Sequence, residues 1–244
     1  MKSKELFLQR PVVWITGASR GIGFEIAKQF SFIGCNVCLS SRNLKQLKSA
    51  TKEIIELGGR AHAFPLDVTV PKNIPSVVHK IEKEVGQIDV LVNNAGVTVF
   101  KTFNDTTLNE FRKIIETNLI GPIQCIKAVL PQMIRKKNGW IINIISDAAI
   151  KSIKGSSAYT ASKSGLLALG DVLREEVRQF NIKVINVLPG ATSTEIWHPK
   201  VRRKYEYRMM KAKSVAEAVL SVYQMPNDAV VDEMVIRPVL GDLN

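Results

Sequence analysis

Short apolar runs alternate with segments of helical period along this chain, and the alternation restricts the folds available to it. The expected strands are residues 12–15, 36–40, 61–66, 88–92, 140–145, 183–188 and 229–236. The expected helices are residues 22–32, 44–57, 74–85, 108–136, 157–180 and 215–223. Strands that alternate with helices favour a parallel sheet with helices on both faces. The sequence therefore predicts a doubly wound α/β sheet of about seven strands, with its ligand crevice at the carboxyl ends of the strands.

Length and composition agree with one such domain. The chain has 244 residues, close to the upper limit for one core, and no repeat or linker divides it, so we expect a single domain over residues 1–244. Its three cysteines are interpreted as buried thiols, ahead of a redox or metal role, and no metal site is expected. No stretch resembles a signal peptide or a membrane span, which predicts a cytoplasmic protein without a membrane partner.

The formal net charge of +12 is unevenly distributed, because half of it lies in residues 197–213. That segment has one acidic residue, Glu206, and its basic residues are Lys200, Arg202, Arg203, Lys204, Arg208, Lys211 and Lys213. Elsewhere the basic residues are spread along helices, which is typical of a solvated surface and does not require a nucleic-acid partner.

Three glycines lie between the first expected strand and the first expected helix, in the run Thr16-Gly17-Ala18-Ser19-Arg20-Gly21-Ile22-Gly23. A side chain at these glycines would block the tight turn or the close approach of a pyrophosphate, and the helix start offers free amide hydrogens. The candidate dinucleotide contacts in this Rossmann-type fold are therefore Gly17, Ser19, Arg20, Gly21, Ile22 and Gly23. A plain glycine-rich turn is the alternative, and the flanking strand and helix favour the dinucleotide.

The end of the second strand reads Leu39-Ser40-Ser41-Arg42-Asn43 and carries no acid. NAD-binding folds place an acidic residue there to hold the ribose 2′-hydroxyl. Here Arg42, together with Arg20, offers guanidinium groups suited to a 2′-phosphate, so NADP(H) is preferred and NAD(H) is the alternative. Asp67 and Val68 follow the third strand, where they either hold the adenine or form an ordinary turn.

Tyr159 and Lys163 are four residues apart on an expected helix and therefore share a face. The pKa of a free tyrosine is about 10, and lowering it by about 2–3 pH units requires about 3–4 kcal/mol. One ammonium at ~4 Å supplies about 4 kcal/mol at an effective dielectric constant of ~20. Ser146 precedes Tyr159 by 13 residues, at a strand end where its hydroxyl can bond a carbonyl oxygen. The spacing of Tyr159 and Lys163 alone is a common accident, but together with the serine it indicates a proton-transfer site.

With these motifs the chain resembles the short-chain dehydrogenase/reductase family over about residues 10–190. The matching motifs are residues 16–23, residues 93–96, Asn118, Ser146, Tyr159, Lys163 and Pro189-Gly190. The resemblance implies that Tyr159 is the general acid/base, that Lys163 lowers its pKa and binds ribose, and that Ser146 orients the carbonyl. It also implies that Asn118 holds a water of the proton relay. Further implied cofactor contacts are Asn94, Ala95, Gly96, Pro189, Gly190 and Thr192.

The resemblance implies an NADPH-dependent oxidoreductase that transfers a hydride between nicotinamide and a carbonyl or secondary alcohol. Residues 191–213 would form a substrate lid, and its positive charge favours anionic or carrier-bound carbonyls such as 3-oxoacyl thioesters, unless it is only a solvated loop. One alternative is an NAD-linked dehydrogenase of small hydroxy acids. An alternative of another class is a dinucleotide-sensing regulatory or nucleic-acid-binding protein, which the net charge favours and the complete Ser-Tyr-Lys set opposes.

The two longest expected helices suggest self-association. Pro122 is expected to bend the first of them, because proline lacks the amide hydrogen and clashes with the preceding turn. A second apolar stripe on the two helices consists of Leu119, Ile123, Ile126, Leu166, Leu169 and Leu173. In the resembled family such helices pair across a two-fold axis, so we expect a dimer or a tetramer, with the alternative that both stripes face the sheet.

Overall fold

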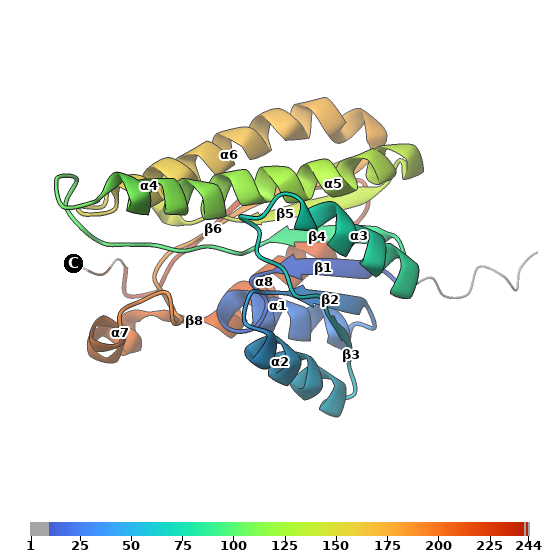
Figure 1. Cartoon of the computed structure of the whole chain (residues 1–244), viewed down its shortest axis with the longest axis horizontal. Helices are drawn as coiled ribbons and strands as arrows, with labels where there is room; N and C mark the ends of the chain where they lie inside the picture. The colour runs from blue at the N-terminus through green and yellow to red at the C-terminus, as the bar shows by residue number, and fades with distance from the viewer. Residues whose placement is uncertain (1–9, 242, 244) are drawn as a thin grey trace, which may run out of the picture.

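The computed structural model describes residues 10–241 and residue 243, and its centre is a parallel sheet (Figure 1). The strands are β1 (Val12–Thr16), β2 (Asn36–Ser40), β3 (Arg60–Ala63), β4 (Ile88–Asn93), β5 (Gly139–Ile144), β6 (Ile182–Pro189) and β9 (Glu233–Ile236). Their order across the sheet is β3-β2-β1-β4-β5-β6-β9. The order reverses between β1 and β4, which is where a doubly wound sheet opens its ligand crevice. The predicted fold class is confirmed.

The central strands are buried on both faces, which explains why they read as apolar runs. Every residue of β1 and of β5 is buried. The third strand ends at Ala63, earlier than expected, and beyond it single hydrogen bonds from the Phe64 and Leu66 amides to the Leu39 and Ser41 carbonyl oxygens continue along β2. The last strand begins at Glu233 and not at residue 229, since it pairs only with residues 186–189 of β6.

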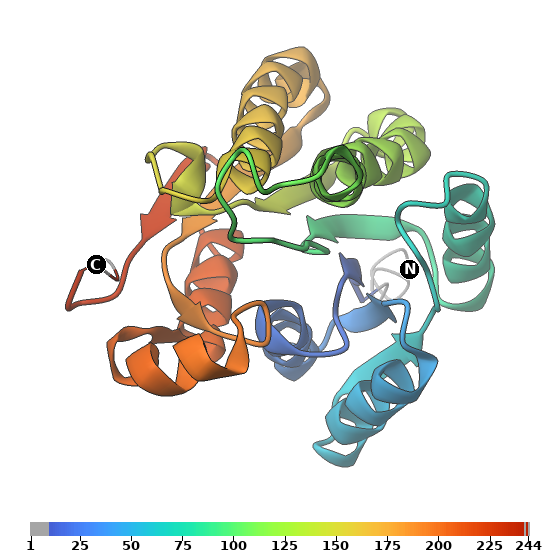
Figure 2. The ribbon, with the colours of Figure 1, turned by 60° about the vertical axis from the view of Figure 1, so that its left-hand side comes forward.

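Helices cover both faces of the sheet (Figures 1 and 2). One face carries α1 (Gly21–Phe32), α2 (Leu44–Glu56) and α8 (Ala212–Tyr223). The other carries α3 (Asn73–Glu84), α5 (Gly121–Lys136) and α6 (Ser157–Val177). Each face has its own apolar core, and the three cysteines are free and buried.

A row of buried asparagines crosses the sheet beside the crevice. Asn93 donates to Asn143 at 3.0 Å, and Asn143 donates to Asn186 at 3.1 Å, at matching positions of β4, β5 and β6. Asn186 in turn donates to the carboxylate of Asp171 on α6 at 3.0 Å. Buried amides need hydrogen-bond partners, so this row fixes the relative register of three strands and one helix.

The expected helix over residues 108–136 is interrupted, but by a different feature from the one expected. α4 (Leu108–Ile115) is followed by a π-helical turn, Glu116–Ile120, and α5 begins after that turn. Pro122 lies directly after that turn, as the second residue of α5, and its missing amide hydrogen leaves the carbonyl oxygen four residues earlier, on Asn118, without its α-helical donor. The π-helical turn contains Asn118, and such turns are frequent at functional sites.

The apolar stripe expected on the surface of these helices is largely covered within the chain. Ile126, Leu166 and Leu173 are buried in the core. Leu119 packs against Gly165 of α6, where an added Cβ would lie 3.0 Å from Leu119 Cδ2. Most of this stripe therefore faces the chain's own core, as the alternative interpretation held.

The segment after β6 is more ordered than the loop expected from its charge. It contains β7 (Thr192–Ser193), a helix α7 (Pro199–Tyr205) and β8 (Met210–Lys211), and β7 pairs in parallel with β8. Ser193 also donates to Glu206 at 2.8 Å, which adds a second link between the start of this segment and the residues that follow α7. α8 begins at Ala212, three residues before the expected start.

Two features of the described residues bear on partners. No helix there is long and apolar enough to cross a membrane. Within the same residues, no group of three or more His, Cys, Asp or Glu side chains is placed to hold a metal ion.

Candidate active site

The glycine loop is packed tightly against the turn that follows β4. Gly17 and Gly21 have φ values of +65° and +61°, a region that glycine adopts without strain. An added Cβ on Gly17 would lie 2.8 Å from Ala95 Cα, and one on Gly23 would lie 2.3 Å from Asn94 Nδ2. Glycine is therefore required at positions 17 and 23 because a side chain would clash with residues 94 and 95. This reason adds to the one expected from the sequence, which is the close approach of a pyrophosphate.

Hydrogen bonds join the same two segments. Asn94 Nδ2 donates to the carbonyl oxygens of Thr16 and Gly17, both at 3.0 Å. The Thr16 hydroxyl accepts from the backbone amides of Asn94 and Ala95, both at 3.1 Å. α1 begins directly after the loop, and no side chain caps its N-terminus. Its first amide hydrogens are thus suited to an anionic ligand.

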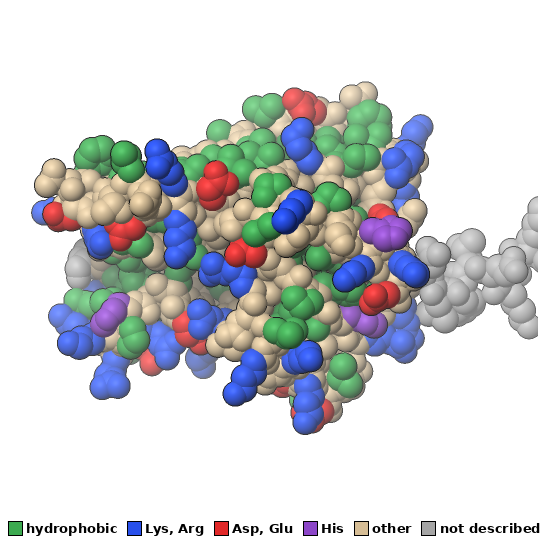
Figure 3. All heavy atoms as spheres, viewed as in Figure 1, with side chains coloured by type: hydrophobic (Ala, Val, Ile, Leu, Met, Phe, Trp, Pro, Cys, Tyr) green, Lys and Arg blue, Asp and Glu red, His purple; other side chains and the backbone are tan. Residues whose placement is uncertain are grey.

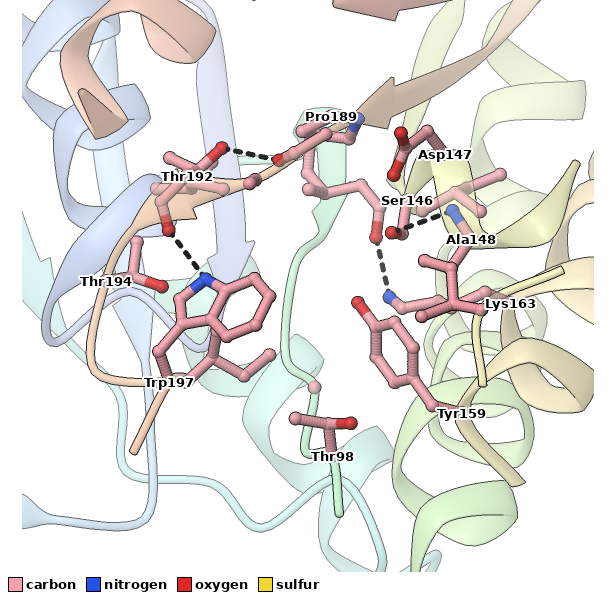
Figure 4. Close-up of a pocket in the computed structure, with 18 of the residues that line it drawn as sticks. Thr98, Ser146, Asp147, Ala148, Tyr159, Lys163, Pro189, Thr192, Thr194 and Trp197 are labelled. Atoms are coloured by element: carbon pink, nitrogen blue, oxygen red, sulfur yellow. Dashed lines mark hydrogen bonds between the residues drawn. The ribbon is translucent and has the colours of Figure 1, made fainter. Parts of the chain in front are cut away.

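Ser146, Tyr159 and Lys163 converge at the carboxyl end of β5 (Figure 4). Ser146 follows β5, and its hydroxyl accepts from the Ala148 amide at 3.2 Å and hydrogen-bonds to Tyr159. Tyr159 and Lys163 lie one turn apart on α6, as their spacing predicted. Lys163 is buried, and its Nζ donates to the carbonyl oxygen of Ile144 at 2.8 Å.

Burial dominates the electrostatics of this site. The pKa of Tyr159 is raised to about 12, mainly by burial and also by the charge of Asp147, although the hydrogen bond from Ser146 acts in the opposite direction. Burial also lowers the pKa of Lys163 to about 8. The expectation that Lys163 alone lowers the pKa of Tyr159 is therefore not met in this structure. Its Nζ lies 5.9 Å from the centre of the tyrosine ring.

Asn118 occupies a supporting position behind Lys163. Its side chain is fully buried and forms three hydrogen bonds, two with the backbone of Val97 at 2.9 Å and one with Ser162 at 3.0 Å. These bonds engage both polar atoms of the Asn118 side chain, at the residue that is expected to hold a water of the proton relay. The backbone carbonyl oxygen of Asn118 remains available to a water. In a regular α-helix the amide hydrogen of residue 122 would bond this oxygen, but Pro122 has none.

A cavity of about 820 Å³ connects the glycine loop with the Ser-Tyr-Lys cluster, a volume typical of small-molecule and cofactor sites. The predicted residues that line it are Gly17, Arg20, Gly21, Ile22, Asn94, Gly96, Ser146, Tyr159, Lys163, Pro189, Gly190 and Thr192. Those that are not part of its lining are Ser19, Gly23, Arg42, Asp67, Val68, Ala95 and Asn118. The arrangement fits a dinucleotide, because flexible glycine backbone and helix amides lie at one end and proton-transfer groups lie at the other.

A family model described as short chain dehydrogenase matches residues 11–204 of this chain. The chain belongs to the short-chain dehydrogenase family. The residues matched include the glycine loop, the Ser-Tyr-Lys cluster and Pro189-Gly190, so the match covers the cavity and not only the sheet.

Individual members agree with this placement. Dehydrogenase/reductase SDR family member 7 of Mus musculus is 34% identical over 230 residues, which are 92% of this chain and 66% of the relative. Sepiapterin reductase of Chlorobaculum tepidum is 33% identical over 239 residues, covering 95% of this chain and 98% of the relative. The crystal structure of a metagenomic short-chain oxidoreductase in complex with NADP has a TM-score of 0.83 at 32% identity and covers 94% and 97% of the two chains. The chain thus spans just under two thirds of the mouse relative and nearly all of the other two.

Two of the residues assigned to the cofactor also have contacts within this short-chain dehydrogenase. One carboxylate oxygen of Asp67 accepts from the amide of Thr69 at 3.0 Å and from its hydroxyl at 2.8 Å, which is a turn role. Val68 is buried against Gly121 of α5. At the end of β2, Arg42 is exposed, whereas Arg20 lines the cavity.

The sequence analysis missed several cavity residues of this short-chain dehydrogenase. Asp147 directly follows Ser146, is buried, and lies 3.6 Å from Lys151 Nζ and 3.7 Å from Arg237 Nε. Its position next to the strand-end serine was a usable signal. Phe100 and Trp197 also line the cavity, but each comes from an irregular segment, and no local pattern marks them.

Proposed function

We propose that this chain is an NADPH-dependent carbonyl reductase or the corresponding alcohol dehydrogenase. The observation that carries the proposal is the convergence of Ser146, Tyr159 and Lys163 on one cavity with the glycine loop. Bound NADPH would supply the hydride, and the protein would supply the proton and the carbonyl's hydrogen bonds.

Each residue of the cluster has a role that follows from its contacts. Tyr159 donates the proton to the developing alkoxide, and Ser146 hydrogen-bonds the same oxygen. Lys163 is held by the Ile144 carbonyl oxygen and lines the cavity, and its ammonium would bind the ribose hydroxyls of the cofactor and favour the tyrosinate. A water on the Asn118 carbonyl oxygen would resupply the proton, while the Asn118 side chain positions Val97 and Ser162.

The preference for NADP(H) rests on charge at the end of β2. Leu39 to Asn43 contain no carboxylate to repel a 2′-phosphate, and Arg20 lines the cavity nearby. A related structure binds NADP, which supports the same choice. NAD(H) use, with a small hydroxy acid as substrate, is the alternative.

The proposed substrate is a small or carrier-bound ketone or aldehyde. α7 turns Val201 and Tyr205 toward the cavity, whereas Lys200, Arg203 and Lys204 are exposed. Figure 3 shows Lys and Arg side chains over this part of the outer surface. The basic charge of the lid therefore lies mainly outside the cavity, and Lys151 and Lys154 are the cavity residues that support an anionic substrate.

The test is the variant Tyr159→Phe, which removes only the acidic hydroxyl. We expect it to bind NADPH and to lose about 10²- to 10⁴-fold in kcat with a panel of ketones and aldehydes. NADPH oxidation and a binding titration measure the two effects separately. If the variant keeps more than about a tenth of the rate, Tyr159 is not the proton donor.

Two further parts of the proposal concern the whole protein. We propose self-association as a dimer or tetramer, supported by the exposed apolar side chains of Val172 on α6 and Val235 on β9. We also propose a reducing, cytoplasmic location, supported by three buried cysteines that are all free.

A further inference from the structure

Two aromatic rings meet at the mouth of the cavity. Phe100 belongs to the loop between β4 and α4, and Trp197 belongs to the lid between β7 and α7. Their ring centroids are 5.2 Å apart and their planes differ by 9°, so the rings are stacked. Both residues line the cavity. Contact between two such distant segments closes this side of the site with a flat aromatic surface.

Both rings are held in place from outside the stack. Trp197 Nε1 donates to the Thr192 carbonyl oxygen at 3.1 Å, and Thr192 belongs to the β7–β8 pairing. The loop that carries Phe100 is bound at the next residue, where the Lys101 amide donates to the Gly155 carbonyl oxygen at 2.9 Å. The Trp197 ring is thus held by its own hydrogen bond, and the backbone beside Phe100 is held by the Gly155 carbonyl oxygen.

The aromatic surface lies beside the proposed proton donor. The centroids of Phe100 and Tyr159 are 6.5 Å apart, and Figure 4 shows Trp197 across the cavity from Tyr159. If Tyr159 and Ser146 hold the oxygen of a ketone, one of the two groups on the carbonyl carbon would thus lie next to Phe100 and Trp197. Ile196, Val201 and Tyr205 continue the apolar wall on the lid side.

We propose that Phe100 and Trp197 form an aromatic clamp that selects carbonyl substrates with a flat, conjugated group attached to the carbonyl carbon. The inference rests on the proposed function and specifies its substrate class. A flat ring can stack on the clamp, whereas a puckered ring of the same size makes only edge contacts with it. Aromatic stacking adds about 2- to 12-fold in affinity beyond the burial of apolar area.

The experiment uses two ketones with the same carbon skeleton, acetophenone and cyclohexyl methyl ketone. The selectivity is kcat/KM for the flat ketone divided by kcat/KM for the puckered one, measured by NADPH oxidation. Conjugation changes the intrinsic reactivity of acetophenone equally in all variants, so changes in selectivity between variants report on the protein. We expect Trp197→Leu and Phe100→Leu each to lower the selectivity by about 2- to 12-fold.

Two further variants complete the design. Trp197→Phe retains a ring and should keep most of the selectivity lost in Trp197→Leu. Phe103→Leu is the matched control, because Phe103 lies on the same loop as Phe100 but is 75% exposed, packs on Phe111 and is not in the cavity lining. This control should leave the selectivity unchanged.

A binding measurement separates this inference from the proposed function. Trp14 and Trp140 are buried in the sheet at 0% and 8% exposure, so quenching of tryptophan fluorescence by acetophenone reports mainly on Trp197. Phe100→Leu should weaken acetophenone binding, and Phe103→Leu should not. If no carbonyl is reduced but this difference is found, the proposed function fails and the clamp stands. If ketones are reduced while neither Trp197→Leu nor Phe100→Leu changes the selectivity, the clamp is overturned and the function stands.

Discussion

At the scale of single residues, Asp147 is the unexpected charge of the site. It is buried one residue after Ser146, and its negative charge disfavours ionisation of Tyr159 and so raises the pKa of that hydroxyl. Lys151 Nζ and Arg237 Nε both lie within 4 Å of the same oxygen of its carboxylate, at 3.6 Å and 3.7 Å. The charge of one side chain thus contributes to the proton affinity of the proposed donor.

Replacing Asp147 should therefore change the pH dependence of carbonyl reduction. Asp147→Asn removes the negative charge and leaves the positive charges of Lys151 and Arg237 without it. The loss of the negative charge and the remaining positive charges both favour the tyrosinate. The pKa of Tyr159 should fall, and reduction, which needs the protonated hydroxyl, should decline at a lower pH than in the wild type. A profile of kcat/KM against pH measures the change, with the exposed Asp228→Asn as control. If kcat/KM of the variant falls at the same pH as in the wild type, or at a higher pH, Asp147 does not have this role.

Cofactor choice is also decided by single side chains. We expect Arg20→Asp and Arg42→Asp to lower kcat/KM for NADPH relative to NADH, because a carboxylate would face the 2′-phosphate. Loss of a hydrogen bond to a charged group corresponds to about 10- to 150-fold. Arg60 is exposed and lies at the start of β3, whereas Arg42 follows the end of β2. The two residues therefore lie at opposite ends of the parallel strands, and Arg60→Asp is the matched control. If Arg42→Asp leaves the ratio unchanged while Arg20→Asp lowers it, the glycine loop alone holds the phosphate.

At the scale of secondary-structure elements, the packing of the glycine loop on the turn after β4 is the critical contact. Gly23 is buried in α1, and Asn94 fills the space that any side chain at position 23 would need. The amide of Asn94 also bonds two carbonyl oxygens of the loop. A substitution here must move either the helix or the asparagine.

Gly23→Ala should accordingly destabilise the fold as well as the cofactor site. Overpacking typically costs about 1–3 kcal/mol, which corresponds to a fall in Tm of about 2–12 °C for a chain of this size. In a double-mutant cycle, Asn94→Ala should relieve part of the clash, so the double variant should cost less than the sum of the single variants. Additive costs would show that Gly23 and Asn94 act independently, against the geometry.

At the scale of the whole molecule, β9 is an edge strand with exposed apolar neighbours. It pairs with β6 on one side only, and Val235 in the strand and Val239 and Leu240 after it are exposed. An edge strand offers unpaired amides and carbonyls to a second copy. The outer face of α6, which carries the exposed Val172, is the other surface suited to self-association.

Sedimentation should therefore give a mass at least about twice the 27.1 kDa of one chain. Val235→Lys and Val172→Lys test the two surfaces separately, because a charge at a buried apolar interface opposes association. The variant that lowers the mass identifies the interface. A wild-type protein that sediments as a single chain at all concentrations would rule out both surfaces.

The local features of this protein were determined by the sequence alone. The alternation of strands and helices, the glycine loop, and the spacing of Ser146, Tyr159 and Lys163 all depend on hydrophobic period and on residues close together in the chain. Such information is local, so it can be read without coordinates. The ends of β3 and β9 could not be read, because they depend on which residues of the neighbouring strand are available for pairing.

Only the tertiary structure decided which side chains meet. Asn94 contacts Gly23, Phe100 stacks on Trp197, and α7 turns Val201 toward the cavity, and none of these contacts joins neighbours in the sequence. The direction of the pKa shift of Tyr159 was wrongly predicted for the same reason. The attraction of Lys163 could be anticipated from a spacing of four residues, but the burial that outweighs it is the combined effect of many distant residues.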